Sequence, residues 1–210
     1  MDQKLDHTKI EFFWEWFSDN EARIRDVIED YSPHEREEIV HELDNQILEF
    51  GMFTWEIGHG FSRSYYLTIS PNGDQELLAR SRLIMQSAPD LPFWEFYHAR
   101  PVKDWDLIIN LYDDMMNEHH VNASEWKFVL SRGRNNRINV LIEASNMGHL
   151  DNETKWTAGN MVVMSLIGEE CRINEVNKID IIDKFEDRHK DAGSPIVDLK
   201  LNLDKLLERQ

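Results

Sequence analysis

Residues 53–73 read FTWEIGHGFSRSYYLTISPNG, and this stretch decides the fold class. Apolar and polar side chains alternate with a period of two over residues 53–57 and again over residues 64–69, which is typical of half-buried strands. Gly58-His59-Gly60 supplies a turn between them, because glycine readily adopts a positive φ. Pro71-Asn72-Gly73 ends the second strand in another turn. The stretch therefore predicts two neighbouring strands.

The residues before this stretch have the periodicity of helices. Apolar side chains recur at steps of three and four over residues 8–30, and Ser18-Asp19-Asn20-Glu21 predicts a break inside that helix. Ser32-Pro33 predicts the start of a second helix, because serine is a good N-cap and proline suits the first helical position. Gly51 is expected to end it. Residues 1–51 therefore predict a helical hairpin.

The residues after the stretch alternate between strand and helix patterns. We expect helices over residues 74–88 and 152–167, and strands over residues 93–97, 105–112, 125–131, 137–144 and 173–182. Residues 113–124 fit either a loop or a short helix. The tail from residue 194 fits a strand that enters a short helix.

The order of these patterns predicts an α+β fold. A helical hairpin comes first, and a mostly antiparallel or mixed sheet follows, with helices packed on one face. No linker is long enough to separate domains, so we expect a single domain over residues 1–210. Its parts are a helical segment over 1–51, a sheet with two helices over 52–184 and a tail over 185–210.

Acidic residues are concentrated near the N-terminus. The formal net charge is −17, and residues 1–50 hold 15 acidic and 5 basic residues, a net charge of −10. Nucleic acids and anionic membranes are bound by fields of Lys and Arg, so this charge disfavours both as partners. The acidic region is either a solvated helical face or a docking surface for a basic protein partner. The candidate residues of such a surface are Glu35, Glu38, Glu42 and Asp44.

Histidines and carboxylates near residue 119 are candidate metal ligands. Glu118, His119, His120 and Asp114, with Asp113 beside Asp114, have the side-chain chemistry that binds zinc, manganese or iron. Adjacent histidines do not face one site in regular structure, and the chain contains no His-Glu-x-x-His motif. An exposed polar loop explains the same residues. A divalent metal is the one cofactor that the sequence suggests.

The single cysteine, Cys171, excludes an intrachain disulfide framework. The preceding Glu169 and Glu170 predict a raised thiol pKa, so Cys171 is a poor candidate nucleophile. No apolar run near the N-terminus has the form of a secretory signal, and no run reaches the length of a membrane span. We therefore expect a soluble, cytoplasmic protein.

Four short motifs follow one another along the chain. They are Phe13-Trp14-Glu15-Trp16-Phe17, the segment YLTISPNG over residues 66–73, the segment SAPDLPFW over residues 87–94, and Gly168-Glu169. In this order they resemble a family of uncharacterised bacterial α+β proteins with the pattern ISxNG followed by APxLPxW. The resemblance spans roughly residues 8–182. It implies a compact α+β domain and brings no established activity.

Two functions fit these observations. The first is a non-catalytic binding protein, for example an immunity-type protein that masks a basic toxin. The second is a small metal-dependent hydrolase that uses the His and carboxylate residues near position 119. We favour the first, because no catalytic motif is recognisable in the sequence.

Overall fold

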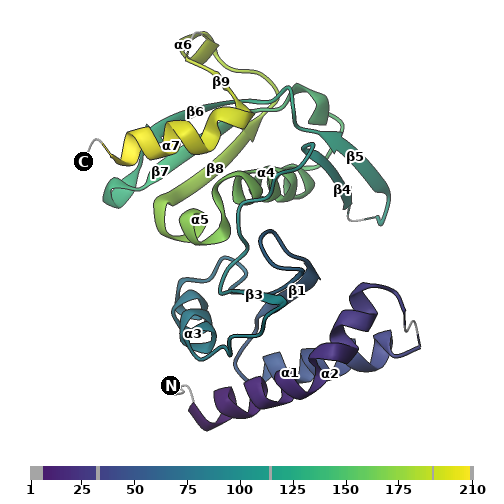
Figure 1. Ribbon diagram of the computed structural model, residues 1–210. Coiled ribbons are helices and arrows are strands. Elements are labelled where there is room, and N and C mark those ends of the chain that lie inside the picture. The colour runs from purple at the N-terminus through teal and green to yellow at the C-terminus, as the bar shows by residue number, and fades with distance from the viewer. Residues whose placement is uncertain (1–6, 32–33, 114, 191, 209–210) are drawn as a thin grey trace. The chain divides into compact units, whose positions relative to one another are not determined.

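The structure is a computed structural model that describes residues 7–31, 34–113, 115–190 and 192–208 (Figure 1). Its fold is α+β, as predicted. The chain forms two compact units, residues 1–100 and 101–210, and each contains its own hydrophobic core. We predicted a single domain over residues 1–210. Whether the two units form one domain depends on whether they unfold together, so the single domain stays a prediction.

In the first unit a helical hairpin precedes a three-stranded sheet (Figure 1). The elements in chain order are α1 (His7–Ile28), α2 (Arg36–Leu48), β1 (Thr54–His59), β2 (Tyr65–Ser70), α3 (Gln75–Gln86) and β3 (Trp94–Tyr97). The strand order is β1-β2-β3, with β1 antiparallel to β2 and β2 parallel to β3. The predicted start of α2 at Ser32-Pro33 lies outside the described residues.

The break predicted at residues 18–21 is wrong, because α1 runs through them without interruption. The Ser18 hydroxyl donates to the carbonyl oxygen of Trp14 at 2.7 Å, and the Asn20 amide donates to the carbonyl oxygen of Trp16 at 2.9 Å. Both polar side chains therefore have a hydrogen-bond partner in the preceding turn. Because the side chains do not compete for the backbone N–H groups of the helix, the helix continues through these residues.

An aromatic cluster holds α1 against one face of the sheet. The Phe17 ring lies 4.9 Å from the Trp94 ring and 5.6 Å from the Phe96 ring, both in edge-to-face geometry. The Trp14 ring lies 4.8 Å from Phe96, and its indole N–H donates to the carbonyl oxygen of Ile84 in α3 at 2.9 Å. Edge-to-face pairs add stabilisation beyond the area they bury. The cluster therefore determines which side of α1 faces solvent.

One carboxylate holds the connection between β1 and β2. Glu95 accepts hydrogen bonds from the backbone N–H groups of Ser62 and Arg63 and from the Tyr97 hydroxyl. Burial alone would raise the pKa of Glu95, but these bonds outweigh it and lower the pKa to about 2. Gly60 does not have the positive φ that the sequence predicts. A Cβ there would lie 2.5 Å from the Arg63 carbonyl oxygen, so close packing requires the glycine.

The second unit contains a mixed four-stranded sheet of order β8-β7-β6-β9 and a separate antiparallel pair, β4 and β5. The strands are β4 (Ile108–Tyr112), β5 (Glu118–Asn122), β6 (Lys127–Arg132), β7 (Ile138–Glu143), β8 (Val176–Ile182) and β9 (Ser194–Pro195). The helices are α4 (Asn152–Ile167), α5 (Glu169–Glu175), α6 (Asp187–Lys190) and α7 (Leu199–Leu207), with 3₁₀ helices at Arg134–Asn136, Ser145–Met147 and Ile196–Asp198. The strand and short helix predicted for the tail are β9 and α7.

Side chains on one face of the four-stranded sheet form the core of this unit. Phe128 and Ile142 lie opposite each other in β6 and β7, and both are buried. Gly159 of α4 packs against this face, because a Cβ there would lie 2.7 Å from Ile181 and 3.8 Å from Ile142. On the other face, Lys127 is exposed. Helix α4 therefore covers this face of the sheet.

Two expectations for the second unit are wrong. Residues 118–122, expected in a loop or short helix, form strand β5. Val121 is its one fully buried side chain, so the segment lacks the apolar alternation of a strand, and pairing with β4 supplies its order. Residues 173–175, expected at the start of a strand, end helix α5.

The aromatic cluster yields a first testable expectation. Phe17 is fully buried, whereas Phe12 in the same helix is 63% exposed. We expect Phe17→Ala to lower the free energy of unfolding by about 3–5 kcal/mol, because it leaves a cavity among aromatic rings. Phe12→Ala is the matched control and should change it by about 0.5 kcal/mol or less. Urea titration of both variants measures this, and equal losses would contradict the packing described.

The lowered pKa of Glu95 yields a second testable expectation. A carboxyl whose pKa falls from 4.5 to about 2 on folding stabilises the fold above pH 4.5 and loses that contribution as the pH falls through 2. We expect Glu95→Gln to lower the urea midpoint at pH 7, with a smaller difference from wild type at each step below pH 4.5. A difference that stays constant down to pH 2 would show that Glu95 is not held as a carboxylate.

Candidate functional site

The acidic residues predicted to bind a partner lie along or just before α2. Glu38, Glu42 and Asp44 belong to the helix, and Glu35 is the residue before its first turn. Asp44 and Glu38 are exposed, whereas Glu35 and Glu42 are half-buried. The structure thus groups them on one short helix, and their role in partner binding stays a prediction.

Three of these carboxylates have partners within the first unit. Arg23 of α1 lies 3.5 Å from Glu38 and 3.5 Å from Glu42. Asp44 accepts a hydrogen bond from the Trp55 indole at 3.1 Å. A positive charge between two carboxylates offsets part of the field that a basic partner would meet. The α2 residues are therefore a weaker source of free negative charge than their number suggests.

The acidic stripe of α1 is the stronger source. We use this name for the exposed side chains of Glu11, Glu15, Asp19 and Asp26, which recur at steps of four and seven residues. Such steps return to one face of a helix. The buried residues that follow the same periodicity, Phe17 among them, lie on the face toward the sheet. The stripe is not apparent from the sequence, because the break expected at residue 18 divides it.

An open hollow of about 470 Å³ lies beside this stripe. Its lining comes from one turn of α1 and from the segment after α3, and consists of Trp14, Glu15, Ser18, Asp19, Ser87 and Pro89. Two carboxylates one helical turn apart therefore line a concave surface with an aromatic wall. Such a surface can accept the ammonium or guanidinium group of a long basic side chain.

The two histidines of the predicted metal site lie on opposite faces of a strand pair. In strand β5, His119 lies opposite Leu111 of β4 and His120 lies opposite Asn110, so the two imidazoles leave opposite faces of the strand pair. His120 hydrogen-bonds with the Asn110 side chain at 2.6 Å. Glu118 shares the face of His120. Asp114 lies outside the described residues, so the predicted set as a whole stays a prediction.

His119 instead has two neighbours, Asp113 from the predicted His and carboxylate set and His149, which the sequence did not connect with it. Its Nε2 lies 3.0 Å from Oδ2 of Asp113, at the turn between β4 and β5. Its ring centre lies 5.7 Å from that of His149, which is exposed between two helices. Thirty positions separate the histidines, so no spacing motif signals the pair. No three His, Cys, Asp or Glu residues are grouped to hold a metal ion within the part of the chain that the structure describes.

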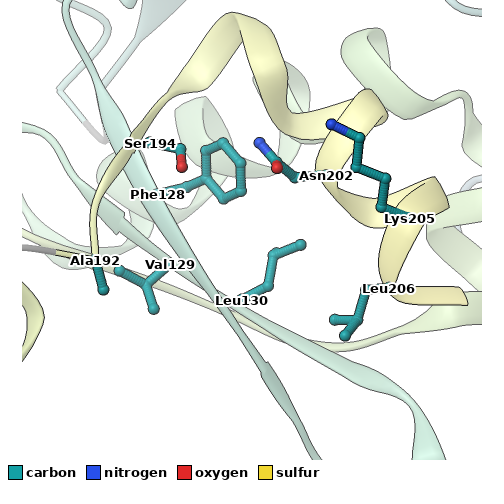
Figure 2. A pocket seen from close by; sticks show the side chains of 8 residues that line it. All are labelled: Phe128, Val129, Leu130, Ala192, Ser194, Asn202, Lys205 and Leu206. Carbon is teal, nitrogen blue, oxygen red and sulfur yellow. The ribbon is translucent and has the colours of Figure 1, made fainter. Parts of the chain in front are cut away.

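A second hollow lies in the second unit between β6 and α7 (Figure 2). Its volume is about 230 Å³, and side chains of Phe128, Leu130 and Leu206 contribute apolar lining. Among the described residues that line it, Lys205 is the one with an ionisable side chain. A general acid–base pair or a metal ligand set needs further titratable groups. This hollow therefore has the composition of a binding surface rather than of a catalytic centre.

Cys171 has the raised thiol pKa that the sequence predicts, although burial is its main cause. Burial raises the pKa to about 11, and the nearby carboxylates of Glu175 and Glu170 act in the same direction. Only a small fraction of the thiol is ionised near neutral pH, so Cys171 is not an activated nucleophile.

Comparisons of the chain with protein-family models, with curated proteins and with solved structures find no match. The resemblance to a bacterial α+β family therefore rests on the short motifs quoted above. Within the described residues, no helix combines the length and apolar character needed to cross a membrane.

The Cys171 environment yields a third expectation. A thiol with a pKa of about 11 is far less ionised at pH 8 than a free cysteine with a pKa near 8.5. We expect iodoacetamide to modify Cys171 in the folded chain on the order of 100-fold more slowly than in the chain unfolded in urea. Intact mass measured over time at pH 8 follows the reaction. Comparable rates would show that Cys171 is ionised and accessible in the fold.

Proposed function

We propose that this protein is a non-catalytic binding protein that docks a basic protein partner through the acidic stripe of α1. The hollow lined by Glu15 and Asp19 carries the proposal. It combines two exposed carboxylates with a concave shape, and the aromatic cluster holds its helix in place. A lysine or arginine of the partner enters this hollow and pairs with both carboxylates.

The charge distribution supports the same partner class. Residues 1–50 carry a net charge of −10 out of −17 for the whole chain, which attracts a basic protein before contact. Opposite fields speed association and disfavour partners of the wrong sign. Glu11 and Asp26 extend the stripe on either side of the hollow, so the attraction acts along most of α1.

In this proposal α2 contributes to the rim of the docking surface. Glu38 and Glu42 already share Arg23, so a partner gains less from them than from Glu15 and Asp19. Glu35 and Asp44 belong to the same rim. The four α2 residues remain part of the proposed surface, and the α1 residues form its centre.

Such a surface suits a protein that masks the basic site of its partner. A protein that covers the basic site of a toxin or enzyme needs charge complementarity and a rigid face, and it needs no catalytic group of its own. Carboxylates in an open hollow at the surface suit charge pairing with a partner, which is what masking requires. We therefore propose an immunity-type role, in which the partner's activity is blocked while it is bound.

Charge reversal tests the proposal. Full-length protein carrying Glu15→Lys and Asp19→Lys is immobilised beside wild type and incubated with lysate of the cells that produce it. Its control carries Glu118→Lys and Glu125→Lys, an equal charge change at exposed positions of the second unit. We expect wild type and control to retain a basic protein at low salt and to release it at about 0.5 M salt, where screening is strong. The α1 variant should retain at least about ten-fold less, the effect of removing charged pairs at an interface centre.

Three results would overturn the proposal. One is that wild type retains no basic protein at low salt. Another is that retention is insensitive to salt, and the third is that the α1 variant binds as well as the control. Circular dichroism of both variants shows whether the fold is intact, so that a loss of binding is assigned to the surface.

A further inference from the structure

We propose that His119 and His149 form a binding site for a divalent transition metal ion in the second unit. The site is separate from the acidic stripe and does not depend on the proposed function. It also differs from the set that the sequence suggests, because it uses His149 in place of His120. Water completes the coordination of the ion, since the protein supplies two ligands.

The separation of the two rings suits a shared ion. Zinc binds imidazole nitrogen at about 2.0–2.1 Å with tetrahedral angles, which places the centres of two ligating rings about 5 Å apart. The observed centres are 5.7 Å apart with the ring planes at 53°. His149 is exposed, so a small rotation of its side chain brings both rings to the bonding separation.

Asp113 orients the His119 ring for this purpose. Its carboxylate accepts a hydrogen bond from Nε2 at 3.0 Å, which leaves the Nδ1 lone pair of the neutral imidazole to bind metal. The carboxylate is itself held by the backbone N–H groups of Met115 and Asn117, each at 2.9 Å. A carboxylate behind a ligating histidine is the usual outer-shell partner at zinc sites.

The backbone around His149 is held in place as well. Met147 is fully buried and Leu150 nearly so, and the Leu150 N–H donates to the Met147 carbonyl oxygen at 3.0 Å. The histidine is thus presented from a short segment anchored on both sides. His119 lies in a strand that is paired with β4, so both ligands come from ordered backbone. Metal binding therefore costs little conformational entropy of the chain.

The ligand chemistry selects the class of metal. Two imidazoles suit zinc, copper and nickel, whereas magnesium and calcium prefer oxygen ligands. The net charge of −17 raises the local concentration of cations in general. Selectivity for zinc over magnesium therefore comes from the imidazoles and distinguishes this site from diffuse attraction by carboxylates.

Calorimetric titration of the full chain with zinc chloride tests the proposal. The protein is prepared without a histidine tag and freed of metal with a chelator. We expect one zinc site in wild type, an affinity at least about ten-fold lower in His149→Ala, and no equivalent signal with magnesium chloride. His120→Ala is the matched control and should bind zinc within about two-fold of wild type, because its imidazole is on the opposite face of the strand pair.

Any other result of these titrations would overturn the proposed site. Absence of zinc binding by wild type would do so, as would a His149→Ala variant that binds like wild type. An equal loss in His120→Ala would favour the ligands suggested by the sequence over those inferred here. Circular dichroism without metal verifies the fold of both variants, and His149 is exposed, so its substitution is not expected to unfold the chain.

Discussion

The packing of Phe17 against Trp94 and Phe96 is the interaction on which the rest of the first unit depends. This packing buries one face of α1 in the core. Because a helix has 3.6 residues per turn, the residues on the opposite face then lie in solvent. Glu15 and Asp19 lie on that solvent face one turn apart, beside a hollow with Trp14 in its wall. The acidic stripe is therefore a consequence of how the helix is buried. A helix broken at residue 18 would not present these carboxylates as one surface.

In the second unit, the alternation of side chains along strand β5 determines which histidines lie together. Because successive side chains leave opposite faces, His119 and His120 cannot act together, although they are adjacent in sequence. His119 turns toward Asp113 and His149, and His120 turns toward Asn110. The cluster that results contains an imidazole hydrogen-bonded to a carboxylate and a second imidazole whose ring centre lies 5.7 Å from the first. Its chemistry suits metal coordination, whereas Lys205 is the one ionisable group that the described residues bring to the hollow beside α7.

Much of the fold was predictable because its periodicities are strong. The apolar repeat of α1, the position of strand β2 and the turn after it all follow from local sequence, although β2 is buried over four consecutive residues instead of in alternation. The break at residue 18 was wrong because hydrogen bonds from Ser18 to the preceding turn are not visible in a residue pattern. Strand β5 was missed because its order comes from pairing with β4, with one fully buried side chain of its own. The contact of His119 with His149 was beyond reach because it is purely tertiary.

The carboxylates of α1 are the docking surface that we propose for a basic partner. Carboxylate footprinting by carbodiimide-activated labelling tests it most directly, with the full chain labelled alone and then in complex with the protein it retains at low salt. We expect strong protection of Glu15 and Asp19 in the complex, weaker protection of Glu38 and unchanged labelling of Glu125, which lies in the other unit. Labelling of Glu15 and Asp19 that is the same with and without the partner would contradict it.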